Sequence, residues 1–252
     1  MTKHRYFFSI SFNGSNYHGW QIQPDAITVQ QVMNEHIGVM IGEKVNCVGC
    51  GRTDAGVHAK NYLFHVDIKK ELTATFARKL DAFLPKDIKI NRIYANPKKI
   101  HARWDARFRS YEYIVSKGKD PFRIELVTNT FEKFNLERMN QACEILMEYD
   151  DFETFSKSHN SQNHYFCELI HASWSETDEH YLFSIKANRF VRSMVRMIVG
   201  TMLDVGRGRV SLDGFRKIIE SKDRKNAGKT VPAGGLYFTG VGFPEDVLIE
   251  LS

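Results

Sequence analysis

A short glycine-rich loop carries the side chains of this sequence that are best suited to chemistry. It runs from Gly49 to Ala59 and places Asp54 between two glycines, with Arg52 two residues earlier. Glycines let a ligand or a neighbouring backbone come close, and an ionised carboxylate can act as a nucleophile or a base. The same spacing suits a surface turn in which Asp54 caps backbone amides and pairs with Arg52. Spacing alone favours the turn, so other parts of the sequence must decide.

A second segment, from Ala187 to Gly200, combines arginines with an apolar pattern. Read as part of a helix over about 190–205, it places Arg189, Arg192 and Arg196 on one face, and the remaining positions are largely apolar. Arg189 and Arg192 can extend to solvent along a helix surface. Burying an unpaired guanidinium is costly, so we expect Arg196 to meet a carboxylate, a phosphate or both.

Basic residues are concentrated in two stretches of the chain. Between residues 186 and 229 they far outnumber acidic residues, which predicts an anionic partner. The second stretch interleaves basic and aromatic side chains: Lys98, Lys99, Arg103, Trp104, Arg107, Phe108, Arg109, Tyr111 and Tyr113. This pattern suits contacts to a nucleic-acid backbone and its bases, although it is also common on ordinary surfaces.

Three other motifs lack the context that their usual chemistry requires. Gly228-Lys229-Thr230 resembles the end of a phosphate-binding loop, but Asp223 stands where the required glycine belongs. A possible dinucleotide fingerprint at 206–211 follows an expected helix instead of a strand. Cys47 and Cys50 have a zinc-like spacing, but on the expected strand they would point to opposite faces. We therefore expect no metal site.

The composition is that of an ordinary globular protein. The chain has 252 residues, of which 42% are hydrophobic and 26% charged, and its formal net charge is +5. We expect no signal peptide, because polar residues interrupt the apolar run near residue 6 too soon, and no segment approaches the roughly 20 apolar residues of a membrane span. Four cysteines are too few for a disulfide framework. We expect a cytoplasmic protein with no membrane partner and with free thiols.

Hydrophobic periodicity predicts alternating strands and helices throughout the chain. The clearest helix begins after Thr28, a good N-cap, and ends before Gly42, where a C-terminal glycine belongs. The other expected helices are 72–83, 136–147, 190–205 and 212–221. The expected strands are 6–12, 45–48, 62–68, 88–94, 111–115, 166–174, 181–187 and 236–241.

Pairs of strands between helices favour an α+β class with largely antiparallel sheets over a doubly wound parallel sheet. We expect two halves with no flexible linker between them. Residues 1–105 form an N-terminal α/β half with the aspartate loop, and residues 106–252 form a C-terminal α/β half with the basic helix.

Motifs along nearly the whole chain resemble those of the tRNA pseudouridine synthase A (TruA) family. The segment Gly51-Arg52-Thr53-Asp54-Ala55-Gly56-Val57-His58-Ala59 is similar to the signature loop of that family. The other matching segments, in the family's order and spacing, are Gly14 to Gln30, Leu84 to Ile88, His101 to Tyr113, Ala187 to Gly200, Asp223-Arg224 and Pro232 to Leu236.

The resemblance implies a pseudouridine synthase fold, with two similar halves and a central basic cleft. It implies isomerisation of uridines 38, 39 and 40 in the anticodon stem-loop of tRNA, without metal or organic cofactor, by a homodimer. Asp54 is then the catalytic aspartate, Arg196 its basic partner and Tyr111 the tyrosine that contacts the target base. Arg52 is implied to help extrude the target nucleotide, and Leu236 to pack beside it.

The other basic residues of the two basic stretches are our candidates for phosphate contacts. Arg103, Arg109 and Arg192 are among them. The stretch 155–164 is poorer in arginine and lysine than the corresponding family loop, and Trp104 stands where phenylalanine is common. The alternative function is a non-catalytic tRNA-binding or RNA-chaperone protein that uses the same surface. Loss of chemistry would be expected to remove Asp54 or Tyr111, and both are present.

Overall fold

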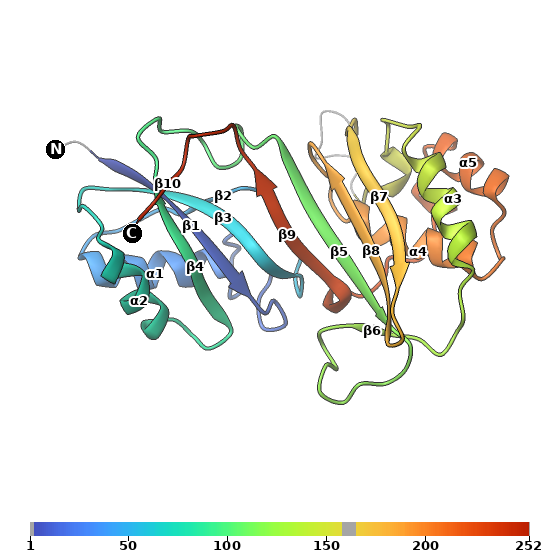
Figure 1. The fold of residues 1–252 in the computed structure, drawn as a ribbon, viewed down its shortest axis with the longest axis horizontal. Coiled ribbons are helices and arrows are strands. Elements are labelled where there is room, and N and C mark those ends of the chain that lie inside the picture. The colour runs from blue at the N-terminus through green and yellow to red at the C-terminus, as the bar shows by residue number, and fades with distance from the viewer. Residues whose placement is uncertain (1–2, 158–164, 252) are drawn as a thin grey trace. The chain divides into compact units, whose positions relative to one another are not determined.

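The structure is a computed structural model and describes residues 3–157 and 165–251. The chain forms two compact units, one made of residues 1–108 and 238–252 and the other of residues 109–237. Figure 1 labels their helices and strands along the chain. Strands pair mostly antiparallel and helices stand between them, which confirms the predicted α+β class.

The first unit is built on an antiparallel sheet with the strand order β10-β4-β1-β3. These strands are β1 (His4–Phe12), β3 (His58–Ile68), β4 (Ile88–Ala95) and β10 (Ile249–Glu250), and the short β2 (Val48–Gly49) pairs with β3. Residues 6–10 of β1 are all buried, so this central strand is covered on both faces. In register, Phe8 lies opposite Phe64 on β3 and opposite Ile93 on β4.

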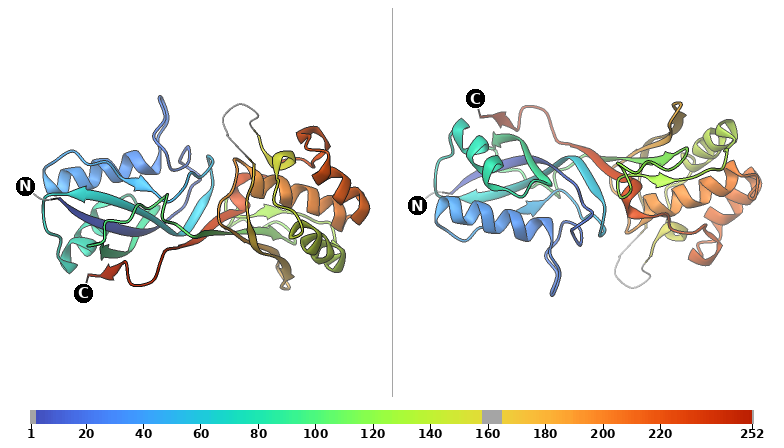
Figure 2. Two further views of the ribbon diagram at one scale, coloured as in Figure 1. Left: turned by 90° about the horizontal axis from the view of Figure 1, so that it is seen from above. Right: turned by 90° about the horizontal axis from the view of Figure 1, so that it is seen from below.

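Two helices accompany this sheet, α1 (Val29–Ile41) and α2 (Ala74–Phe83) (Figures 1 and 2). As predicted, the Thr28 hydroxyl accepts a hydrogen bond from the Gln31 amide, and Gly42 ends α1 in the left-handed region at φ 77°. The buried face of α1 consists of Val29, Val32, Met33 and Ile37. His36 of α1 contacts Phe83 of α2 with ring centroids 4.8 Å apart, so the two helices pack against each other.

The second unit is built on the antiparallel strands β5 (Phe108–Ser116), β8 (His180–Ala187) and β7 (Leu169–Glu176), in that order. The short β6 (Thr128–Asn129) pairs with β5 in parallel. Helix α3 (Leu136–Leu146) is tied to β7 by Asn140, whose side chain both donates to and accepts from the backbone of Trp174. Strand β9 (Leu236–Gly242) begins in this unit and continues into the first.

Helix α4 (Met194–Gly206) forms the core of the second unit, and nearly all of its residues are buried. A Cβ added at Gly200 would lie 1.9 Å from the carbonyl oxygen of Lys229, so the helix backbone touches the 228–231 segment directly. Helix α5 (Leu212–Glu220) follows, with Ser211 as its N-cap. The short 3₁₀ turns η1 (Glu153–Phe155), η2 (Arg224–Asn226) and η3 (Ala233–Gly235) complete the unit.

The expected start of α4 near residue 190 is wrong. The helix begins at Met194, because Ser193 lies in the left-handed region at φ 62° and a right-handed helix cannot pass through it. Arg189 and Arg192 therefore precede the helix, and the predicted arginine face over 189, 192 and 196 does not exist.

Candidate active site

The aspartate loop, Cys50–Val57, connects β2 to β3, and hydrogen bonds to β3 hold its first two residues. The Cys50 amide donates to the Leu63 carbonyl at 2.9 Å, and the Tyr62 hydroxyl donates to the Gly51 carbonyl. Within the loop, the Val57 amide donates to the Asp54 carbonyl at 3.2 Å and closes a turn. The aspartate therefore begins a turn that follows two residues bonded to β3 and leads directly into β3 at His58.

Two glycines from the β1–α1 connection pack directly on this loop. A Cβ at Gly14 would lie 2.0 Å from the Val57 carbonyl oxygen, and one at Gly19 would lie 2.1 Å from the Thr53 carbonyl oxygen. Gly19 also has φ 79°, which only glycine adopts without strain. Gly14 and Gly19, the two glycines of the motif that begins at Gly14, are thus explained together, because each leaves room for one backbone contact with the aspartate loop. The loop is preorganised by backbone packing.

The side chains of the loop differ in exposure. Asp54 is half-buried and Arg52 is exposed, so the arginine extends to solvent while the carboxylate stays close to the protein. Between them, the Thr53 hydroxyl is a buried side-chain oxygen for which the described part of the chain offers no hydrogen-bond partner. Burial of the Thr53 hydroxyl could not be predicted from the sequence, because it depends on which residues pack against it.

In the second unit, Tyr111 lies on β5 opposite Ile185 of β8 and is 9% exposed. The ring of Phe190 meets it edge to face, with centroids 5.1 Å apart and planes at 89°. Such a geometry is favourable for aromatic pairs and fixes the tyrosine ring. Arg109, two residues earlier on the same strand, donates from Nη1 to the Asn188 carbonyl at 2.8 Å. This arginine has a structural bond in addition to its predicted phosphate contact.

Arg196 is half-buried in the first turn of α4. Its Nε donates to the Val231 carbonyl at 2.8 Å, and the Val231 amide donates back to the Arg196 carbonyl at 3.3 Å. A cation at a helix N-terminus opposes the helix dipole, so this position is not explained by the stability of α4. The carbonyl of Val231 fixes the guanidinium but does not neutralise it.

The backbone of Val231 and Pro232 binds both Arg196 and Tyr113, a fully buried residue of β5. Its hydroxyl bonds to the Thr128 hydroxyl and donates to the Pro232 carbonyl at 2.8 Å. Burial raises the pKa of Tyr113, whereas the Thr128 hydrogen bond and the charge of Arg196 act in the opposite direction. Gly235 presses on the ring of Tyr113, and the buried Leu236 follows it at the start of β9.

The basic stretch 186–229 is less cationic in the folded chain than in the sequence. Arg207 pairs with Glu132 and Asp204, Arg216 with Glu148 and Lys222 with Asp151. The acidic partners mostly come from residues 132–151, outside the stretch. These ion pairs reduce the positive charge that the stretch offers to an external anion, and anion binding by the stretch stays a prediction. Arg192 and Arg103 are exposed, and the predicted loop at 155–164 lies mostly outside the described residues, which exclude 158–164.

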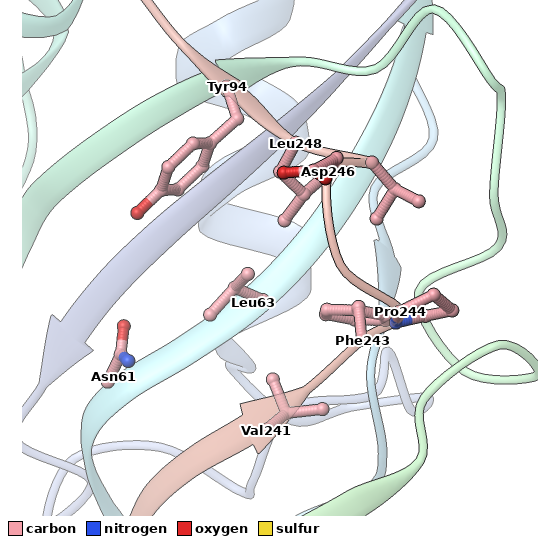
Figure 3. Close-up of a pocket in the computed structure, with 9 residues that line it drawn as sticks. Asn61, Leu63, Tyr94, Val241, Phe243, Pro244, Asp246 and Leu248 are labelled. Atoms are coloured by element: carbon pink, nitrogen blue, oxygen red, sulfur yellow. The ribbon is translucent and has the colours of Figure 1, made fainter.

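Two further features are the four cysteines of the chain and a hollow in the first unit. All four cysteines are buried, and burial raises the pKa of Cys143 to about 12 and that of Cys167 to about 11. The hollow has a volume of about 270 Å³ and is lined by Asn61, Leu63, Tyr94, Val241, Phe243, Pro244, Asp246, Val247 and Leu248 (Figure 3). It includes no residue of the aspartate loop. Within residues 3–157 and 165–251, no cluster of three metal-ligating side chains is found, and none of the helices is long and apolar enough to cross a membrane.

Comparison with known proteins decides the family. The family model for tRNA pseudouridine synthase matches residues 9–105 and 142–244. The chain belongs to the tRNA pseudouridine synthase family. As a tRNA pseudouridine synthase it is an isomerase, and the family expected from the sequence motifs is confirmed.

Relatives of this tRNA pseudouridine synthase match over nearly their full lengths. The tRNA pseudouridine synthase A of Parabacteroides distasonis is 44% identical over 245 residues, covering 96% of this chain and 97% of the relative. The tRNA pseudouridine synthase A of Bacteroides thetaiotaomicron is 42% identical and covers 98% and 93%. That of Porphyromonas gingivalis is 42% identical and covers 97% and 99%.

Proposed function

We propose that this protein isomerises uridine to pseudouridine at positions 38, 39 and 40 of the tRNA anticodon stem-loop, with Asp54 as the catalytic carboxylate. The observation that carries the proposal is the aspartate loop. Its backbone is held by Gly14 and Gly19, while the Asp54 side chain remains partly exposed. Rigid placement of a reactive group is what a catalytic site requires, and a mere surface turn would not need two backbone contacts of this kind.

The reaction exchanges one glycosidic bond for another within the same nucleotide. The bond from N1 to C1′ breaks, the uracil turns in place, and a bond from C5 to C1′ forms. C5 then loses its proton, and N1 gains one, so atoms balance without an external reactant. Asp54 acts at the sugar, either by attacking or stabilising C1′ or by taking a proton next to it. One carboxylate suffices, because no water is activated.

The other residues take roles that follow from their chemistry. Tyr111 contacts the target base, and its hydroxyl serves in the proton transfer from C5. Arg196 is the basic partner that keeps Asp54 ionised, since an opposite charge favours the carboxylate. Its place in the first turn of α4, against the helix dipole, supports a role other than stabilising that helix.

A uridine inside a stem must leave its base stack to reach Asp54, which costs a few kcal/mol. In this proposal Arg52, which is exposed, assists that step, and Leu236 packs beside the extruded nucleotide. Arg103, Arg109 and Arg192 supply phosphate contacts that offset the cost. We propose that the enzyme works in the cytoplasm as a homodimer and uses no metal or organic cofactor.

Release of tritium from tRNA transcribed with [5-³H]uridine tests this chemistry, because every isomerisation transfers the C5 hydrogen to solvent. We expect release with the purified wild-type protein in a buffer containing a chelator. Release should reach a plateau at the number of uridines among positions 38–40. Tight tRNA binding with no release would instead favour a non-catalytic RNA-binding protein.

A further inference from the structure

Four aromatic rings of the first unit contact one another in series from the core to the surface, with the two histidine rings edge to face and the outermost pair stacked. The ring centroids are 5.6 Å apart between Phe7 and His65, 4.9 Å between His65 and His101, and 5.8 Å between His101 and Trp104. Phe7 and His65 are buried, whereas Trp104 is 72% exposed. The other two tryptophans, Trp20 and Trp174, are 2% and 4% exposed. This series of rings therefore presents one large aromatic ring to solvent.

The ring of Trp104 is held in place by its surroundings. The Nδ1 atom of His101 accepts from the amides of Arg103 and Trp104, and the His101 amide donates to the Asp105 carboxylate at 2.6 Å. The Nδ1 atom of His65 accepts from the Ala102 amide at 3.1 Å. These bonds fix residues 101–105 as a compact turn on β3. An exposed tryptophan with a fixed backbone and a stacked neighbour is preorganised for binding.

The charge around Trp104 is positive. The guanidinium carbon of Arg103 lies 4.7 Å from the centre of the indole ring, and Lys98, Lys99 and Arg107 nearby are exposed. Asp105 is the acidic residue of the segment 97–107. A second copy of this chain is a poor partner, because a symmetric contact would bring like charges together. An RNA nucleotide fits both features, since its base stacks on an aromatic ring and its phosphate meets a cation.

We propose that Trp104 and Arg103 form a nucleotide-binding platform for an unpaired base of the tRNA other than the target uridine. This inference rests on the proposed function. His58 directly follows the aspartate loop. His65, which contacts the ring of His101, lies on β3 seven residues after His58. At about 3.4 Å per residue, this is about 24 Å along the strand. The platform therefore engages a second nucleotide and positions the tRNA while Asp54 acts on the first.

Fluorescence of Trp104 reads the platform directly, because the other two tryptophans are buried. We expect unmodified tRNA transcript to quench the wild-type emission and to shield it from acrylamide. The Trp104→Phe variant should lack the acrylamide-sensitive signal. Inorganic polyphosphate, which offers charge without bases, should bind without shielding the indole.

Steady-state kinetics of Trp104 variants test whether the platform contributes to tRNA binding during the reaction. Stacking of one base is worth about 1–3 kcal/mol, so Trp104→Ala should raise KM for tRNA by about 5- to 150-fold. It should change kcat at saturating tRNA less than about twofold, and Trp104→Phe should restore most of the affinity. Phe131→Ala is the matched control, because Phe131 is also exposed but lies next to Glu132 in the second unit. We expect it to leave KM unchanged.

Two results would overturn the platform. One is an unchanged KM in Trp104→Ala, together with no shielding by tRNA. The other is shielding of Trp104 by raising the protein concentration without RNA, which would assign this surface to a second copy. Absence of pseudouridine with wild-type protein would overturn the proposed function instead, and the fluorescence test would still report whether tRNA covers Trp104.

Discussion

The aspartate loop of the first unit and the start of α4 in the second unit are positioned in different ways. Backbone contacts at Gly14 and Gly19 fix the loop around Asp54. Hydrogen bonds made by side chains fix Arg196 on Val231 and Tyr113 on Pro232. Adding any side chain at Gly14 or Gly19 would collide with the loop backbone and displace it. Replacing Arg196 or Tyr113 removes only the hydrogen bond that this side chain makes. The two regions should therefore respond differently to substitution.

The largest effect is expected at Gly19. In Gly19→Ala the new Cβ would lie 2.1 Å from the Thr53 carbonyl oxygen, at a φ of 79°. Overpacking and left-handed strain together should lower the free energy of unfolding by about 2–5 kcal/mol. The isomerase activity should fall as well, because Thr53 adjoins Asp54. Urea unfolding and tritium release measure the two effects.

Gly51→Ala is the control for this prediction. Gly51 is in the same loop, but a Cβ there would meet nothing within 4 Å. We expect its unfolding free energy to stay within about 1 kcal/mol of wild type. Equal losses at Gly19 and Gly51 would contradict the view that backbone contacts fix the loop.

The free energy of unfolding is expected to fall by about 2–3 kcal/mol on acidification because of His65 in the first unit. Burial, with a smaller effect of Arg5, lowers the pKa of His65 to about 4. The unfolded chain, with a pKa near 6.5, therefore binds the proton first as the pH falls. The stability that neutral His65 contributes is fully present above about pH 6.5 and is lost as the pH falls toward 4.

Urea unfolding between pH 7.5 and 4 measures this loss. His65→Asn keeps an acceptor near Nδ1 for the Ala102 amide but does not titrate, so its curve should be flatter than that of wild type. Identical pH slopes for the two proteins would show that His65 is not the group responsible.

A smaller and more local effect is expected at Arg196. Arg196→Ala removes the bond from Nε to Val231, which should lower the unfolding free energy by about 1.5–3 kcal/mol, the range for charged hydrogen bonds. Activity should fall by more than stability explains, if Arg196 also keeps Asp54 ionised. Chemical denaturation and kcat at a temperature where both proteins are folded separate the two effects. A fully active and fully stable Arg196→Ala protein would refute both roles.

The smallest expected effect is a gain in stability at Thr53. The Thr53 hydroxyl is buried and, among the described residues, has no hydrogen-bond partner, which costs a protein about 1–3 kcal/mol. Thr53→Val has nearly the same shape without the hydroxyl, so it should unfold at a temperature a few degrees higher. A lower melting temperature would mean that the hydroxyl does have a partner.

Much of the fold was predictable, because it depends on local signals. The caps of α1 at Thr28 and Gly42 were expected and are observed, and most strands were expected to within a few residues. The start of α4 was missed because it depends on the left-handed Ser193, and serine does not signal that conformation. The division of the chain at residue 105 stays a prediction.

The candidate site was predictable only where motifs carry it. Asp54 and Arg196 were candidates from their residue types and spacing, whereas their roles and that of Tyr111 came from the family resemblance and stay predictions. The pairing of Arg207 and Arg216 with distant acids could not be expected from a local charge pattern. The packing of Gly19 on Thr53 joins residues more than thirty positions apart, and the exposure of Trp104 depends on the turn that holds it.

The most direct test of the account maps pseudouridine at single-nucleotide resolution on unmodified tRNA transcripts. The transcripts are incubated with wild-type protein or with Asp54→Asn, with no cofactor added. We predict pseudouridine at positions 38–40 with wild type, and a rate at least about 10³-fold lower with Asp54→Asn. The variant should keep wild-type stability and tRNA affinity. Pseudouridine made equally well by the folded Asp54→Asn protein would contradict the central claim.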